Sequence, residues 1–391
     1  MNNKRSLLKI AAALMLAGTT ALPAHAQDVV KVGLILPMTG PFASTGRQIE
    51  AAARLYMAEH GTTVAGKKIE LIVKDDTNVA DTTKRLAQEL VVNDKVAVLA
   101  GFGLTPLALS TAPIATQAKV PMVVMAAATA MITEQSPYIV RSGFTLPQAT
   151  LGIAKWAPEN GIKKVVTLVS DYGPGIDAQN SFKKVFTASG GEVVQELRVP
   201  VRNPDFAPFL QRVRDAKPDA VFVFVPSGVG SVFMKQFAER GLDKAGIKLI
   251  GTGDVTDDDL LNDMGNVALG VVTSMHYTAA LDNRANKAYV AGIAKANNGM
   301  RPNFHSVGGY DGMHLIYKAL EATKGDTNGD KLLAAMKGQK WESPRGPVML
   351  DPETREMVQN IYISKVERVN GGLYNVPFDK IEAVKDPAKI K

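Results

Sequence analysis

Residues 30–46 read VKVGLILPMTGPFASTG, and this stretch decides the fold. Residues 30–36 form a short apolar run, and the loop that follows contains two Gly, two Pro and three hydroxyl side chains. Apolar residues then recur at helical spacing from Ile49 to Met57. A buried strand that leads through a short loop into an amphipathic helix is typical of a parallel sheet covered by helices.

The same unit recurs along the chain and predicts an α/β fold of two doubly wound parallel-sheet lobes. One series of units ends near residue 125, and a second occupies residues 148–274. The last part of the chain has too few strand-like runs for a third parallel sheet, so we expect it to complete both lobes and to cross between them more than once. The further Val- and Ile-rich runs are residues 69–74, 96–100, 121–125, 164–170, 192–199, 220–225, 247–251 and 269–274.

The N-terminus predicts export. Residues 1–26 combine an early basic segment, a short apolar run at 10–17 and a small-x-small site at residues 24–26, the pattern of a secretory signal cleaved after Ala26. The run is too short to span a bilayer, and no later run is long enough. The chain of 391 residues has no Cys, which excludes disulfides, thiolate metal sites and Cys nucleophiles. These features favour a Gram-negative periplasm.

The sequence gives no support to an enzyme, a metal site, a cofactor or nucleic-acid binding. The net charge of +7 includes the basic residues of the signal, and the remaining Lys, Arg, Asp and Glu are interspersed. Walker A, G-x-S-x-G and H-E-x-x-H motifs are absent, and no two His stand at metal-ligand spacing. We interpret the run Asp257, Asp258 and Asp259 as an acidic helix N-terminus rather than a cation site.

Several loops directly after the expected strands carry residues suited to ligand contact. In the first lobe, the loop at 37–46 leads into a helix N-terminus, whose free N–H groups favour a carboxylate. Thr105 and Thr129 place hydroxyls after two further strands, and Tyr172, Ser227 and Asp254 follow strands of the second lobe. Tyr172 can stack on a ligand, and Asp254 can pair with an ammonium group or accept from a hydroxyl. At most of these positions, helix capping is the alternative.

The whole chain after the signal resembles the periplasmic solute-binding proteins of branched-chain amino acid ABC importers, the Leu/Ile/Val-binding family. The order of its motifs carries this resemblance rather than any one motif. The matching stretches are VGLILP at 32–37, TGP at 39–41 with Gly46, DD at 75–76, PMV at 121–123, AAT at 127–129, DYG at 171–173, KPDAV at 217–221, GYD at 309–311 and GPV at 346–348.

The resemblance implies a type I periplasmic binding fold, with two lobes joined by a three-crossover hinge that close on a small solute. It implies a first lobe of residues 27–146 plus about 277–355 and a second lobe of residues 147–276 plus about 356–391. The implied ligand-binding residues are, from the two lobes and their connections, Phe42, Thr45, Thr105, Ala127, Thr129, Tyr172, Ser227, Asp254 and His305.

Two departures from the family pattern concern the ligand. Asp254 is offset by one position from the family's acid, and the aromatic residue expected near Ser227 is missing. The segment around His276 looks more like a branch of the family associated with hydroxybenzoates and cinnamates. We therefore expect a monomeric binding protein that passes a small carboxylate to a membrane permease. A branched-chain amino acid or related solute is the main expectation; an aromatic acid, or a sensory or amide-binding role on the same scaffold, is the alternative.

Overall fold

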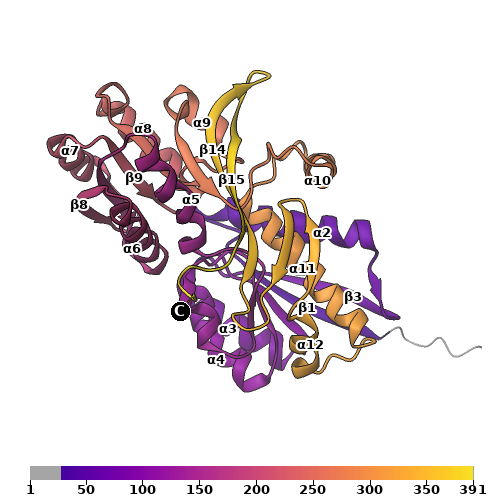
Figure 1. Cartoon of the computed structure of the whole chain (residues 1–391). Coiled ribbons are helices and arrows are strands. Elements are labelled where there is room, and N and C mark those ends of the chain that lie inside the picture. The colour runs from indigo at the N-terminus through magenta and orange to yellow at the C-terminus, as the bar shows by residue number, and fades with distance from the viewer. Residues whose placement is uncertain (1–27, 391) are drawn as a thin grey trace, which may run out of the picture.

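Two sheets, each covered by helices, form two lobes in the computed structural model, which describes residues 28–390 (Figure 1). The fold class predicted from the sequence is confirmed. The signal predicted over residues 1–26 lies outside the described residues, and the predicted lobe boundaries stay a prediction.

The first lobe is built on a six-stranded sheet with the order β2-β3-β1-β4-β5-β6. All its strand pairs are parallel except β2 with β3. The chain moves outward from β1 first in one direction and then in the other, so the strand order reverses between β1 and β4. Its elements are β1 (Val29–Leu36), α2 (Ala43–His60), β2 (Thr63–Val64), β3 (Lys67–Asp75), α3 (Ala80–Val92), β4 (Val98–Gly101), α4 (Thr105–Ala118), β5 (Met122–Val124), the 3-10 helix η1 (Ala130–Gln135) and β6 (Ile139–Arg141).

The second lobe repeats this topology with the order β8-β7-β9-β10-β11, so its strand order reverses between β7 and β9. These strands pair in parallel, as expected for runs buried on both faces. Its elements are α5 (Leu146–Glu159), β7 (Lys164–Ser170), α6 (Gly173–Ala188), β8 (Glu192–Val199), α7 (Ala207–Ala216), β9 (Ala220–Phe224), α8 (Gly230–Glu239), η2 (Leu242–Lys244), β10 (Lys248–Thr252), η3 (Gly253–Thr256), α9 (Leu261–Met264), η4 (Gly265–Ala268) and β11 (Val272–Met275).

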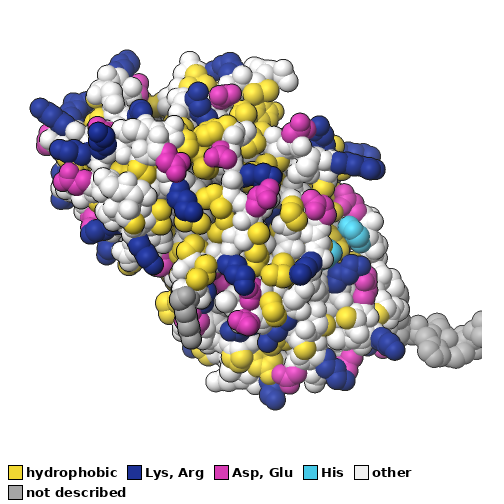
Figure 2. All heavy atoms as spheres, viewed as in Figure 1, with side chains coloured by type: hydrophobic (Ala, Val, Ile, Leu, Met, Phe, Trp, Pro, Cys, Tyr) yellow, Lys and Arg dark blue, Asp and Glu magenta, His cyan; other side chains and the backbone are white. Residues whose placement is uncertain are grey.

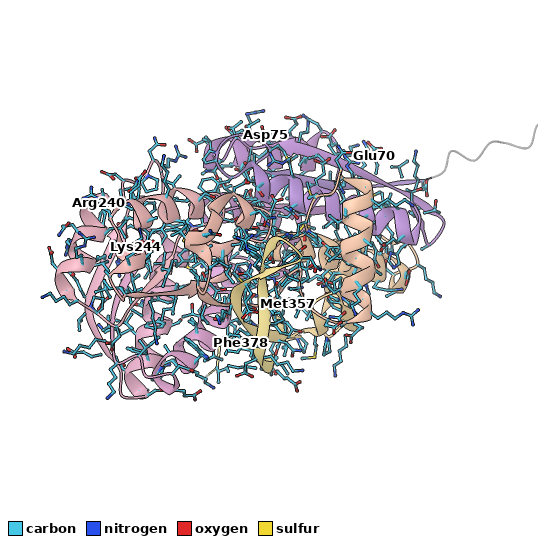
Figure 3. All side chains as sticks on the ribbon, turned by 90° about the horizontal axis from the view of Figure 1, so that it is seen from above. Glu70, Asp75, Arg240, Lys244, Met357 and Phe378 are labelled. Carbon is cyan, nitrogen blue, oxygen red and sulfur yellow. The ribbon has the colours of Figure 1, made fainter. Side chains whose placement is uncertain are left out.

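The last third of the chain serves both lobes. Helix α11 packs along α2 in the first lobe, whereas β14 pairs with β13 at one end and with β11 of the second lobe further along. The strands β14 and β15 thus connect the lobes, and Figure 3 shows them there, labelled at Met357 and Phe378. The elements are α10 (Arg284–Ala296), α11 (Phe304–Ala322), α12 (Gly329–Met336), β12 (Lys340–Ser343), β13 (Gly346–Leu350), β14 (Met357–Val369) and β15 (Gly372–Val384).

Buried polar side chains fix the region where the chain crosses between the lobes. Thr145 and Gln148 form a capping box that starts α5 directly after the first crossing. The amide of Gln148 also donates to the carbonyls of Met357 and Val384, at 2.6 and 3.0 Å, and so ties α5 to both long strands. At the C-terminal end, Lys389 lies 2.5 Å from Glu134 of the first lobe.

The surface carries charges of both signs in a mixed pattern. On the face shown in Figure 2, Lys and Arg alternate with Asp and Glu over both lobes and form no large patch of one sign. Over residues 28–390, the structure contains no helix with the length and apolar character needed to cross a bilayer.

Candidate ligand-binding site

A cavity lies between the lobes, outside the carboxyl ends of β1, β4, β7 and β9. These are the two positions at which the strand order reverses, and open α/β sheets bind ligands at such positions. The empty space between the lining side chains, including the part open to solvent, is about 350 Å³.

The structure brings eight of the nine residues expected from the sequence to this cavity. Those that line it are Phe42, Thr45, Thr105, Ala127, Tyr172, Ser227, Asp254 and His305. The ninth, Thr129, does not line the cavity, but its hydroxyl is 2.7 Å from that of Thr105. Thr129 is therefore placed to orient the Thr105 hydroxyl. Whether these residues bind a ligand stays a prediction.

The first lobe presents helix N-termini and hydroxyls to the cavity. Thr45 lies in the first turn of α2, and Thr105 is the first residue of α4. Asp75, labelled in Figure 3, fixes the loop before α2 by accepting from the Met38 N–H at 3.0 Å and the Thr39 hydroxyl at 2.8 Å. Free N–H groups at a helix N-terminus attract an anion, so this wall is suited to a carboxylate.

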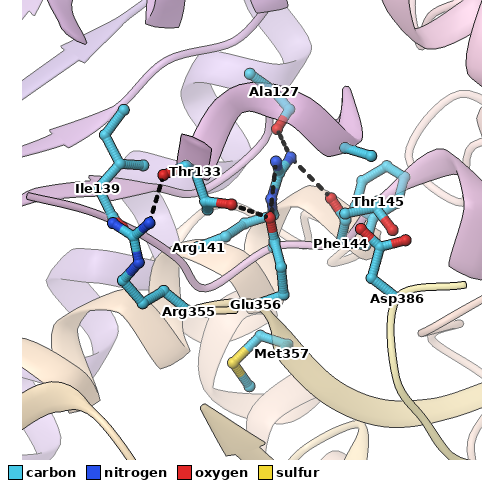
Figure 4. A network of polar contacts seen from close by, with 12 residues as sticks. Ala127, Thr133, Ile139, Arg141, Phe144, Thr145, Arg355, Glu356, Met357 and Asp386 are labelled. Carbon is cyan, nitrogen blue, oxygen red and sulfur yellow. Dashed lines mark hydrogen bonds and ion pairs between the residues drawn. The ribbon is translucent and has the colours of Figure 1, made fainter. Parts of the chain in front are cut away.

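A buried arginine organises the loop that carries Ala127. The guanidinium of Arg141 donates to the carbonyls of Ala127 and Phe144 (Figure 4). It also donates to the carbonyl of Thr129 at 2.7 Å. Glu356, at the start of the third crossing, pairs with Arg141 at 2.6 Å, and both side chains are buried. The shape of the Ala127 loop thus depends on an ion pair to the segment that joins the lobes.

The second lobe supplies an aromatic wall. Tyr172 follows β7 and stacks on Phe224 with a centroid distance of 6.1 Å. Burial raises the pKa of Tyr172 well above 10, with a smaller contribution from Asp254, so the phenol stays protonated. Gly173, beside Tyr172, permits close approach of the lobes, because a Cβ there would lie 2.6 Å from the Thr129 hydroxyl oxygen.

Of the nine other lining residues, six lie in the same loops as the expected residues: Gly103, Leu104, Ala126, Ala128, Pro174 and Pro226. The sequence interpretation missed Phe144, Leu146 and Phe224. The family's aromatic residue near Ser227 is missing here, but Phe224, three positions earlier, brings an aromatic side chain to the cavity. Its place as the last residue of β9 is the one signal that could have identified it.

Asp254 is the acid of the cavity. It lies in η3 directly after β10, is 4% exposed, and accepts from the Thr252 hydroxyl at 2.8 Å. Burial raises the pKa of Asp254 from 3.8 to about 7, and the bond from Thr252 opposes this rise. The carboxyl can therefore act as a hydrogen-bond donor or acceptor near neutral pH.

His305 faces the cavity from the first turn of α11. Burial lowers the pKa of His305 to about 3, so the imidazole is neutral at physiological pH. Its Nδ1 atom is buried and has no hydrogen-bond partner among the described residues. A ligand polar group could satisfy this atom.

The cavity wall, as described, contains neither Lys nor Arg, so an anion would be held by dipoles and hydroxyls. Among residues 28–390, no group of three or more Asp, Glu or His is arranged to hold a metal ion.

The interpretation of the acidic run as a helix N-terminus is wrong. The helix α9 that follows has only four residues, and its N-cap is Leu260, without a side-chain cap. Asp257 and Asp258 instead turn inward; Asp257 accepts from Ser227 and Asn303, and Asp258 accepts from the Ala279 N–H at 3.0 Å. Burial raises the pKa of Asp257 to about 7 and that of Asp258 to about 6.

Residues 29–372 match the family described as periplasmic binding protein. The chain belongs to this family. The chain is 45% identical to the Leu/Ile/Val-binding protein homolog 6 of Brucella melitensis. The aligned stretch of 383 residues covers 97% of this chain and 98% of that relative.

Two solved structures of solute-binding proteins of ABC transporters from Rhodopseudomonas palustris are also similar to this periplasmic binding protein. One, from strain BisB5, is in complex with 3,4-dihydroxybenzoic acid and is 65% identical in sequence. The two structures superpose with a TM-score of 0.91, and the match covers 93% of this chain and all of that protein's chain. The other, from strain HaA2, is in complex with p-hydroxybenzoic acid; it is 44% identical, has a TM-score of 0.90, and covers 93% of this chain and 99% of its own.

The periplasmic binding protein is therefore the solute-binding component of an ABC importer, exported to the periplasm, in a family of transport proteins.

Proposed function

We propose that the solute is an aromatic carboxylate with a ring hydroxyl, of the hydroxybenzoate type. The observation that carries this proposal is the combination of an aromatic wall with two polar side chains that come from elements other than α2 and α4. Tyr172, Phe224 and Phe42 provide flat apolar surfaces, whereas Asp254 and His305 provide the polar groups. The ligands of the two Rhodopseudomonas proteins support the proposal.

In this arrangement, the carboxylate lies against the N-termini of α2 and α4 and the Thr105 hydroxyl. The ring packs between Phe42 and Tyr172. The ring hydroxyl bonds to Asp254 or His305, because each offers a buried polar atom that can donate or accept. An aliphatic amino acid, the main expectation from the sequence, would instead place its ammonium group beside Asp254 and leave the aromatic wall without a stacking partner.

The test is calorimetry with 3,4-dihydroxybenzoate, 4-hydroxybenzoate, benzoate, leucine and valine. We expect both hydroxybenzoates to bind at least about tenfold more tightly than benzoate, because benzoate leaves a buried polar group unpaired. D254N should change the affinity for the hydroxybenzoates more than that for benzoate. Tighter binding of leucine or valine, or no binding by any hydroxybenzoate, would refute the proposal.

We also propose that the mature protein begins at Gln27, acts as a monomer, passes its solute to a membrane permease, and leaves that solute chemically unchanged. Mass spectrometry of the exported protein tests the N-terminus, and light scattering tests the monomer. Chromatography of solute recovered after incubation tests the last point; a new product would show that the protein is an enzyme. ATP hydrolysis by the reconstituted permease should rise when the loaded protein is added.

A further inference from the structure

One buried carboxylate joins a cavity side chain of the second lobe to a side chain of the first lobe. Asp257 is 1% exposed and follows η3 in the second lobe. It accepts from the hydroxyl of Ser227, a cavity residue of the same lobe. It also accepts from the side-chain amide of Asn303, which lies 3.0 and 2.9 Å from its two oxygens. Asn303 belongs to the first lobe, so this contact crosses between the lobes beside the cavity.

Asn303 is firmly fixed in the first lobe. Its side-chain oxygen caps α11 by accepting from the N–H groups of His305 and Ser306, each at 3.0 Å. Its own N–H donates to Gln48 of α2 at 3.2 Å. The side-chain oxygen of Asn303 therefore binds the start of α11, which carries His305, and its side-chain NH2 group binds Asp257.

A second contact across the cleft lies two residues away. The Ser44 hydroxyl, in the first turn of α2, donates to Asp259 at 2.5 Å. The segment that places Asp254 at the cavity is thus followed directly by Asp257 and Asp259, whose carboxylates bind side chains of the first lobe.

We propose that Asp257 is a positioning residue for ligand binding, which acts through Asn303 to hold the two cavity walls together in the closed protein. Asp257 touches no cavity space itself; it sets the position of Ser227 on one wall and of the α11 N-terminus, with His305, on the other. Loss of the contact opens the cleft and releases the solute faster. The proposal rests on the proposed function for the identity of the solute, although not for the existence of the contact.

The deciding variant is N303S. Serine caps a helix about as well as asparagine, but its short side chain cannot cap α11 and also reach Asp257. The matched control is N328S, because Asn328 caps α12 at an exposed site, where its oxygen accepts from the Lys331 N–H. The two substitutions are chemically the same, and N303S alone also removes a contact between the lobes. D257N, alone and combined with N303S, shows whether the two residues act through each other.

Two measurements report on the contact. The first is the dissociation rate of 4-hydroxybenzoate by stopped flow. The second is the distance between the lobes, from spin labels on E70C and R240C, which lie on different lobes at exposed positions (Figure 3). The chain contains no Cys, so the labels attach at these two sites only. Unfolding midpoints of the ligand-free variants separate an effect on closure from an effect on stability.

We expect N303S to raise the dissociation rate about tenfold and to broaden the lobe distance toward longer values, with an unfolding midpoint close to that of N328S. D257N should add little to N303S. A dissociation rate and distance equal to those of N328S would overturn the proposal. If the wild type binds no aromatic acid, the proposed function fails, and the lobe distances of the ligand-free proteins then test the positioning role. Equal distance distributions for N303S and N328S would overturn that role. Loss of the short-distance population in N303S alone would support it.

Discussion

Asp254 should make the protein less stable as the pH rises, and D254N should remove this effect. The carboxyl is buried, and its pKa is about 7 in the folded protein, compared with 3.8 for an exposed carboxyl. An acid with a raised pKa binds its proton more tightly when folded, so the folded state is favoured at low pH and loses that advantage as the pH rises toward 7. The difference between these two pKa values corresponds to about 4 kcal/mol in the free energy of unfolding between low and high pH.

Between pH 5 and pH 8, linkage predicts that the wild type loses about 2.5 kcal/mol more than D254N in the free energy of unfolding. Asparagine keeps the shape and can still accept from Thr252. Asp257 and Asp258 titrate in both proteins, so the difference between the two isolates Asp254.

The assay is urea unfolding of ligand-free protein at four pH values in that interval. The control is D243N, since Asp243 is exposed; its pH dependence should match that of the wild type. Parallel curves for the wild type and D254N would refute the reasoning, because they would show that Asp254 titrates alike in the folded and unfolded chains.

Three further substitutions test the site. T105V removes a hydroxyl at the cavity, and we expect about ten- to a hundredfold weaker binding of 4-hydroxybenzoate by calorimetry; unchanged affinity would remove Thr105 from the site. R141M should lower the free energy of unfolding by about 3–5 kcal/mol, because Glu356 is left buried and unpaired; R141M/E356L should recover part of this, and urea unfolding checks both. G173A should weaken binding without lowering the ligand-free unfolding midpoint, since its Cβ meets Thr129 only where the lobes touch; unchanged affinity would contradict this close approach.

The sequence predicts the strands well because most of them are buried on both faces and read as continuous apolar runs. β7, in which every residue after Lys164 is buried, agrees at both ends with the expected run at 164–170. The loops after these strands were also recognisable, since Gly, Pro and hydroxyl residues follow the apolar runs at regular intervals. Most of the cavity could therefore be anticipated from position along the chain alone.

The missed residues depend on how the lobes meet. Phe144 and Leu146 lie where the chain crosses between the lobes, and only the arrangement of the lobes brings them to the cavity. The sequence predicts the wrong role for Asp257 because three consecutive acids before apolar residues resemble a helix start. Its partner Asn303 is 46 positions away in the chain, so no local pattern reveals the contact.

The place of α11 has a consequence for how the chain folds. This helix packs along α2, and Ile49 of α2 lies under Gly309 of α11, so part of the first core is assembled from segments at opposite ends of the chain. A growing polypeptide that has reached only Met275 has made every strand of the first sheet, yet it cannot cover that face. Contacts between such remote segments slow the search for the native state. The discontinuous order therefore delays completion of the N-terminal lobe until synthesis is nearly finished.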